Sequence, residues 1–255
     1  MSRCLVLRLA GPLQSWGSSS QFNRRETDDR PTKSGVIGLL AAAAGRQRSD
    51  PITDLLRLRL GVRVDQPGSL LRDYHTVSDL SGLPLLSATT TAKGMQARTS
   101  PKKYTHVTER YYLQDAVFVA TVEGDREVLS TLVAALERPA YLLSLGRRSC
   151  VPTRPILLSG PDHGLWEGGL DEVLRQVPWQ ASDHWRRECR GSMSAAATIE
   201  DAGSTETVTD VPISFDPPLR GMTSRSVRHI FIPLGDSGSS AASDGHNPFE
   251  LLGGR

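Results

Sequence analysis

Two adjacent arginines directly follow a glycine in the run Leu-Gly-Arg-Arg-Ser-Cys at 145–150. Glycine permits backbone conformations that other residues resist, and it leaves room for a ligand to approach closely. Each guanidinium is a planar fork of donors that matches phosphate oxygens and stays charged at physiological pH. The turn formed by Gly146, Arg147 and Arg148 therefore suits a phosphodiester. A surface turn whose arginines pair with carboxylates fits these six residues at least as well.

A second cluster interleaves cations with aromatic rings over residues 93–112, where Glu109 is the single acid. The cations are Lys93, Arg98, Lys102, Lys103 and Arg110, and the rings are Tyr104, Tyr111 and Tyr112. This combination suits single-stranded RNA, because cations follow the sugar–phosphate backbone while rings stack on bases. The alternative is a charged loop that is simply exposed to solvent, but the excess of positive charge favours RNA binding here.

Two further segments carry groups that could contact nucleic acid. Gln14, Trp16 and Gly17 follow the first strand-like segment, where the tryptophan could stack on a base or belong to the core. Lys33 and Ser34 stand at an expected helix N-terminus, where free backbone N–H groups and the helix dipole favour an anion. No glycine precedes Lys33 at the P-loop spacing, which excludes nucleotide hydrolysis by such a loop.

A short segment at 71–76 mixes a cation, a ring and an imidazole, and a polar loop at 17–32 adds more arginines. Candidate RNA contacts from these two segments are Arg72, Tyr74, His75, Arg24 and Arg25. The alternative for the first segment is a surface pair between Arg72 and Asp73, with Tyr74 half buried.

Charge is divided unevenly along the chain, although the formal net charge is only +2. Residues 1–160 hold 22 basic and 14 acidic side chains, a net charge of +8, whereas residues 161–255 hold 8 and 14, a net charge of −6. Such asymmetry indicates that one part of the chain meets a polyanion.

No apolar run is long enough to span a bilayer. Three widely spaced cysteines without metal-ligand spacing fit a cytoplasmic protein with reduced thiols, and we expect no cofactor or metal.

Hydrophobic periodicity predicts an α+β protein with strands at 4–9, 58–64, 116–123 and 156–158, and helices at 34–44 and 127–137. Arg57, Arg59 and Arg63 alternate with apolar residues, so the second strand should have a positive outer face. The β-α-β-β-α-β order is the ferredoxin-like pattern of RNA-recognition modules. We expect this domain over 1–160, interrupted by an irregular insertion at about 66–115. A smaller β-rich region should follow over 161–255, with a strand at 227–234 and a flexible stretch at about 235–248.

Five segments, taken together and in this order, carry a resemblance to a known family. They are LVLRLAGPLQSWG (5–17), RPTKSGVIGLL (30–40), LRDYHTV (71–77), ERYYLQDAVFVA (109–120) and SLGRRSCVPTRPI (144–156). This set resembles the CasD family, the subtype I-E form of the fifth Cas protein family, which is a subunit of the CRISPR RNA-guided complex Cascade. The resemblance covers most of residues 4–158. One departure is Ser144, because relatives carry an aromatic residue at that position.

The resemblance implies a ferredoxin-like core from which the insertion protrudes as a hairpin "thumb". It implies a non-catalytic subunit in antiviral defence that binds and caps the 5′ handle of CRISPR RNA (crRNA). Its neighbours would be the backbone subunit CasC and the large PAM-reading subunit CasA, and it would meet target DNA only through the complex. The expected RNA contacts are Gln14, Trp16, Gly17, Arg24, Arg25, Lys33, Ser34, Arg72, Tyr74, His75, Lys102, Lys103, His106, Arg110, Tyr111, Gly146, Arg147 and Arg148.

An alternative is a metal-independent endoribonuclease that cleaves CRISPR repeat RNA, as some relatives in another CRISPR subtype do with a Tyr/Lys/His set. Lys102, Lys103, Tyr104 and His106 lie together and could supply the base, the acid and the cation that such cleavage needs. In subtype I-E, cleavage belongs to a separate subunit, so the resemblance favours binding over catalysis.

Overall fold

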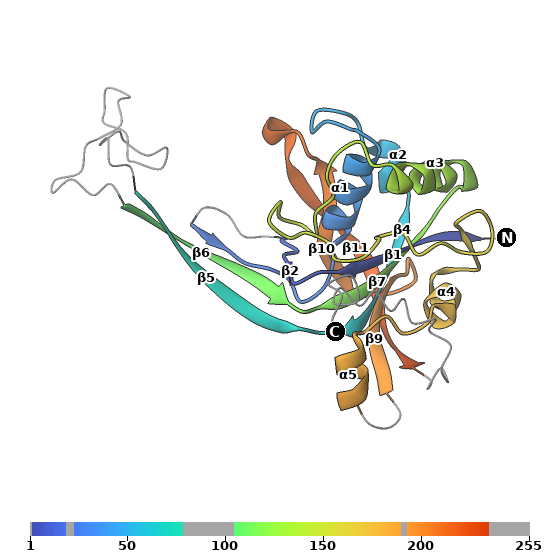
Figure 1. The fold of residues 1–255 in the computed structure, drawn as a ribbon. Coiled ribbons are helices and arrows are strands. Elements are labelled where there is room, and N and C mark those ends of the chain that lie inside the picture. The colour runs from blue at the N-terminus through green and yellow to red at the C-terminus, as the bar shows by residue number, and fades with distance from the viewer. Residues whose placement is uncertain (1, 19–22, 79–104, 190–192, 235–255) are drawn as a thin grey trace, which may run out of the picture.

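A computed structural model describes residues 2–18, 23–78, 105–189 and 193–234 (Figure 1). Its strands are β1 (Arg3–Ala10), β2 (Leu13–Gln14), β3 (Arg24–Arg25), β4 (Arg59–Gln66), β5 (Ser69–Ser78), β6 (Thr105–Gln114), β7 (Val117–Glu123), β8 (Trp166–Glu167), β9 (Met193–Glu200), β10 (Thr207–Ser214) and β11 (Gly221–Leu234). Its helices are α1 (Lys33–Ala43), α2 (Thr53–Leu56), α3 (Arg126–Glu137), α4 (Leu170–Gln176), α5 (Asp183–Glu188) and the short 3-10 helix η1 (Pro217–Leu219). The protein is therefore of mixed α+β class. Within the described residues, no helix has the length and apolar character needed to cross a membrane.

Seven strands form the main sheet, in the order β10-β11-β9-β4-β7-β1-β8. On one side of β7, strand β1 pairs antiparallel with it and sets Leu7 opposite Ala120; on the other side, β4 sets Val62 opposite the same residue. Strand β9 then pairs with β4, with Thr198 opposite Val62. Strands from the second half of the sequence therefore extend the sheet that the first half begins.

Helices cover both faces of this sheet (Figure 1). Helices α1 and α3 pack over Leu5, Leu7 and Phe118 on one face, while α4 packs over Val6 and Val119 on the other. Successive residues of a strand point to opposite faces, so a strand that is covered on both faces must be apolar at almost every position. The unbroken apolar runs of β1 and β7 follow from this arrangement.

The structure differs from three predictions of secondary structure. The insertion at about 66–115, predicted to be irregular, contains β5 and β6, which pair continuously from Ser69 opposite Gln114 to Ser78 opposite Thr105. This hairpin projects from the main sheet (Figure 1). The strand predicted at 156–158 makes only an isolated bridge between Leu157 and Leu7. The region predicted to be β-rich also contains α4 and α5.

The positive outer face predicted for β4 is wrong at Arg63, whose side chain is only 1% exposed beneath α4. Its Nε and Nη2 donate to the carboxylate of Asp65 at 2.6 and 2.9 Å. Its Nη1 donates to the carbonyl oxygens of Leu174 and Val177 at the end of α4. A buried guanidinium is tolerated here because a carboxylate and helix-terminal carbonyls replace its water.

A second, smaller sheet forms around β6, which pairs with β5, β2 and β3. The pairing with β3 is parallel and sets Arg24 beside Glu109 and Arg25 beside Arg110. This sheet brings β3, which belongs to the polar segment at 17–32, against the middle of β6. Many of the residues that the sequence nominates for RNA contact therefore meet on it.

Candidate nucleic-acid interface

The turn at Gly146 approaches the chain after β2 so closely that only glycine fits. Its φ angle is +90°, and a Cβ atom placed there would lie 1.7 Å from the carbonyl oxygen of Ser15. The backbone N–H of Ser15 donates to the carbonyl of Leu145 at 3.1 Å, and the N–H of Leu145 donates to that of Cys150 at 2.8 Å. The glycine is thus required by the fold, and the turn is held rigidly.

Arg147 is half-buried, and its guanidinium binds protein carbonyls, so it has fewer donors free for the phosphate contact that the sequence predicts. Its Nη1 donates to the carbonyl oxygen of Tyr111 at 3.0 Å, and its Nη2 donates to that of Arg25 at 2.8 Å. The guanidinium also lies 4.7 Å from the centre of the Tyr112 ring, a cation–π contact. Arg147 therefore joins the turn, β3 and β6. No pattern in the sequence indicates that Tyr112 would receive this cation.

Arg148 is exposed, unlike Arg147, and makes no hydrogen bond or ion pair with any residue that the structure describes. The contacts of Gly146 and Arg147 fix the neighbouring backbone, so this exposed side chain starts from an ordered position. A rigidly mounted, unpaired arginine is well suited to a phosphate oxygen.

One face of the hairpin gathers cations and rings. Across the β5–β6 ladder, Arg72 lies opposite Tyr111 and Tyr74 opposite Glu109. Arg72 contacts the Glu109 carboxylate at 2.9 Å, and the Arg24 guanidinium lies 5.3 Å from the centre of the Tyr111 ring. Tyr74 is 58% exposed. The alternative pair of Arg72 with Asp73 does not form, since adjacent strand residues point to opposite faces.

The opposite face of the hairpin is more balanced in charge. Arg110 lies opposite Asp73, which also approaches the His75 imidazole at 3.4 Å. The Nε atom of Arg110 is buried and has no hydrogen-bond partner within the described residues. Arg110 also lies beside Arg25 in the small sheet. These residues remain candidates for contact with an anion.

Gln14 and Trp16 lie in the core, so their expected contact with RNA bases is wrong. Trp16 is 1% exposed, and its indole N–H donates to the Gln14 side-chain oxygen at 3.1 Å. The Gln14 amide in turn donates to the carbonyls of Leu9 and Ala116. The Trp16 ring packs against Gly35, where a Cβ atom would lie 2.6 Å away. Gly17 follows on the surface.

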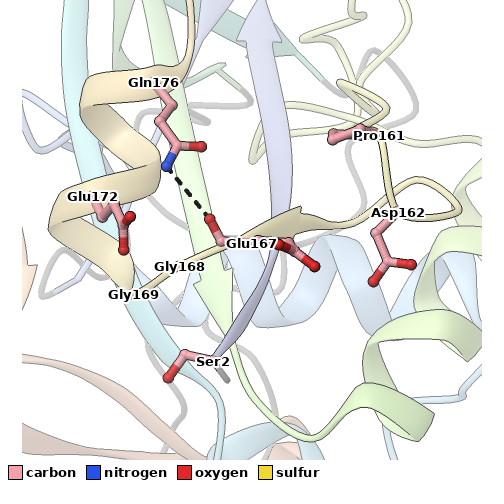
Figure 2. A pocket seen from close by; sticks show the side chains of 8 residues that line it. All are labelled: Ser2, Pro161, Asp162, Glu167, Gly168, Gly169, Glu172 and Gln176. Atoms are coloured by element: carbon pink, nitrogen blue, oxygen red, sulfur yellow. Dashed lines mark hydrogen bonds between the residues drawn. The ribbon is translucent and has the colours of Figure 1, made fainter.

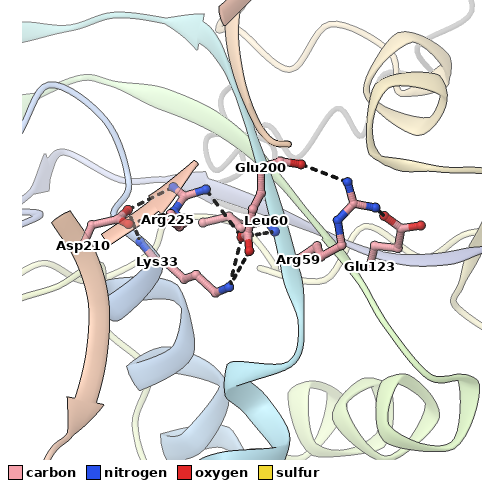
Figure 3. Close-up of polar contacts among 7 residues, drawn as sticks. All are labelled: Lys33, Arg59, Leu60, Glu123, Glu200, Asp210 and Arg225. Atoms are coloured by element: carbon pink, nitrogen blue, oxygen red, sulfur yellow. Dashed lines mark hydrogen bonds and ion pairs between the residues drawn. The ribbon is translucent and has the colours of Figure 1, made fainter. Parts of the chain in front are cut away.

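Lys33 and Ser34 are also buried, and the predicted anion at their helix N-terminus is an internal carboxylate (Figure 3). The backbone N–H of Lys33 donates to Asp210 at 2.8 Å, and its ammonium donates to Glu200 at 2.9 Å. Arg225 completes the network through bonds to Asp210 at 2.7 and 2.9 Å. The helix dipole does favour an anion, but the protein supplies it from β9 and β10.

Lys102 and Lys103 lie outside the described residues, as does Tyr104. The backbone of His106 belongs to β6 and pairs opposite Val77, while its side chain is outside the description. The proposed nuclease set is therefore not assembled by any described contact.

A hollow of about 770 Å³ beside β8 and α4 has the opposite character (Figure 2). Asp162, Glu167 and Glu172 line it, and Arg3 contacts the first two at 2.8 and 2.7 Å. An acidic lining repels a polyanion, so this hollow is no part of the nucleic-acid surface. Within the described ranges, no cluster of three or more His, Cys, Asp or Glu side chains could hold a metal ion.

Comparisons with known proteins agree on one family. Residues 4–228 match the family model described as CRISPR-associated protein (Cas_Cas5). The chain is 36% identical over 174 residues to the CRISPR system Cascade subunit CasD of Escherichia coli (strain K12), covering 62% of this chain and 71% of that protein.

Two solved structures are similar to the whole described fold. A chain of a CRISPR RNA-guided surveillance complex is 35% identical, with a TM-score of 0.71 over 91% of this chain and 90% of its own. A crystal structure of a Cas protein is also 35% identical, with a TM-score of 0.65 over 91% of this chain and 95% of its own.

Proposed function

Because this chain belongs to the Cas5 family of CRISPR-associated proteins, we propose that it is the non-catalytic subunit of a subtype I-E Cascade that binds and caps the 5′ handle of crRNA. The observation that carries the proposal is the exposed Arg148, which has no partner among the described residues, on a turn that Gly146 and Arg147 fix against the hairpin. A cation held this way contributes to affinity without the cost of ordering a flexible loop.

The surface offers two kinds of contact to a single strand of RNA. Arg148, Arg72 and Arg24 would track phosphates, although the latter two share their charge with Glu109 and Glu26. The exposed ring of Tyr74 would stack on a base. Phosphate contacts position the strand and carry little sequence information, so we expect the handle to be recognised mainly by its shape and its free end.

The same proposal includes the fold and the neighbours. Strands β4, β7 and β1 lie side by side in this order, Leu157 bridges to β1, and α1 and α3 cover one face. This arrangement supports a ferredoxin-like core over residues 1–160, with β5 and β6 as its thumb. The partners would be CasC and CasA, with target DNA met through the complex, in the cytoplasm. The similarity to a subunit named for Cascade supports this setting.

Co-expression of the full chain with a CRISPR array and its Cascade partners tests the proposal. We expect wild-type protein to copurify with crRNA that begins in the repeat-derived handle. Arg148→Glu should lose most of that RNA, whereas Arg48→Glu should retain it, because Arg48 is an exposed arginine far along the chain from the turn. RNA of random sequence, or affinity that does not fall as salt rises, would contradict handle capping through phosphates.

A further inference from the structure

Arg8 uses only part of its guanidinium for protein contacts. It alternates along β1 with Leu7 and Leu9 and so lies on the face opposite α1 and α3. Its Nη2 donates to the carbonyl oxygen of Pro155 at 3.2 Å, and its Nη1 donates to the side-chain oxygen of Gln180 at 3.3 Å. Its Nε is buried and has no hydrogen-bond partner within the described residues. Three of the five N–H donors of the guanidinium therefore have no partner among the described residues.

Arg154 brings a second guanidinium to the same place. The segment around it runs antiparallel to β1, with the N–H of Thr153 bonded to the carbonyl of Ala10 at 3.0 Å and the N–H of Arg8 bonded to that of Ile156 at 2.6 Å. Arg154 is exposed. Burial, followed by the nearby charge of Arg154, lowers the pKa of Arg8.

No carboxylate within the described part of the chain pairs with either arginine. The charge of Arg154 disfavours the charged form of Arg8, and a buried donor without a partner costs free energy of its own. An oxyanion held beside the two arginines offsets their mutual repulsion, since the Nη groups of guanidinium forks bind phosphate oxygens. The arrangement is therefore complementary to a phosphate rather than to a neutral ligand.

The pair also lies within reach of the turn. Arg154 follows Arg148 by six residues, which limits the separation of their Cα atoms to about 20 Å. Val151, between them, is 60% exposed. A short single strand of RNA can span that distance.

We propose that Arg8 and Arg154 form a second phosphate-binding site, which holds the same RNA strand that Arg148 contacts. The inference rests on the proposed function and adds to it the path that the RNA strand takes across the protein. From the turn, the strand follows residues 148–154 towards the β1 face that α4 covers, in addition to any contact along the hairpin. The ligand at the pair is a phosphodiester of single-stranded RNA.

Salt-dependent binding of the full chain to a single-stranded RNA of the repeat-derived handle sequence tests the site. Arg154→Ala should lower the slope of log affinity against log salt by about 0.7, the value for one phosphate contact on a single strand. At about 0.1 M salt this weakens binding about fivefold, because the electrostatic contribution vanishes near 1 M. Arg48→Ala, the matched control, should change neither quantity, and neither variant should change the melting temperature.

The possible results separate the two proposals. If wild-type chain does not bind the RNA, both proposals fall. If Arg148→Ala weakens binding while Arg154→Ala behaves like Arg48→Ala, the second site is refuted and handle binding stands. A fall in melting temperature of several degrees for Arg154→Ala would also overturn the inference, because it would make the arginine pair a structural contact.

Discussion

Replacing Arg147 with alanine should destabilise the protein, because this side chain joins three segments of backbone. The substitution removes hydrogen bonds to the carbonyls of Tyr111 and Arg25 and the contact with the Tyr112 ring. Each hydrogen bond in this partly exposed place contributes about 1 kcal/mol, and the cation–π contact contributes about 1 kcal/mol. The expected loss in the free energy of unfolding is about 2–4 kcal/mol, or about 5–12 °C in melting temperature for a chain of this size.

Thermal and urea unfolding of the full chain measure this loss, with Arg148→Ala as the control. Arg148 is adjacent and carries the same charge, yet makes no described contact, so its loss should leave the melting temperature within about 1 °C. Arg147→Lys should be nearly as damaging as Arg147→Ala, because lysine keeps the charge and loses the planar fork.

An unchanged melting temperature for Arg147→Ala, together with loss of bound crRNA, would refute the reasoning. In that event the guanidinium would leave its carbonyl partners and bind RNA directly. Loss of RNA in proportion to loss of folded protein is the expected result, since the arginine then acts by holding the turn in place.

Three other outcomes are expected. Gly146→Ala should prevent accumulation of folded protein, since its Cβ atom would lie 1.7 Å from the carbonyl oxygen of Ser15. Gly17→Ala, the control, should fold, because the nearest atom to its Cβ would be 3.8 Å away. Soluble yield and circular dichroism measure both outcomes. Burial raises the pKa of Cys4 to about 12, so its thiol should stay protonated and unreactive with iodoacetamide at pH 8. The more exposed Cys189 should be alkylated under the same conditions. Mass spectrometry of the native chain compares the two cysteines. Incubation of the purified chain with CRISPR repeat RNA in EDTA should leave the RNA intact, and specific cleavage that His106→Ala abolishes would establish the nuclease alternative.

Local signals predicted the two longest helices, α1 and α3, well because their determinants are local. Periodicity placed helices at 34–44 and 127–137, against Lys33–Ala43 and Arg126–Glu137 in the structure. The hydroxyl of Thr32 caps the first helix by accepting from the N–H of Gly35 at 3.2 Å. The α+β class follows from these elements and from the apolar runs of β1 and β7, all of which can be recognised within a short window of sequence.

The site was predicted less well because the exposure of its side chains depends on partners that are distant in sequence. Trp16, Lys33 and Arg63 have side chains suited to RNA, and all three are buried. Lys33 meets Glu200 across 167 positions of sequence, and α4 covers Arg63 from more than 100 positions away. Residue type shows what a side chain can bind, but only the fold shows whether a partner within the chain already binds it.

The network in Figure 3 also constrains when the protein can finish folding during synthesis. The amino end of α1 is neutralised by Asp210, which is 177 positions further along the chain. Until the ribosome has released β9 and β10, the Lys33 ammonium lacks Glu200 and the first turn of α1 lacks Asp210, and burying these groups uncompensated is costly. Contacts of such long sequence separation form late and slowly. The amino-terminal half, though it emerges first, thus waits for nearly the entire polypeptide before its own packing can be completed.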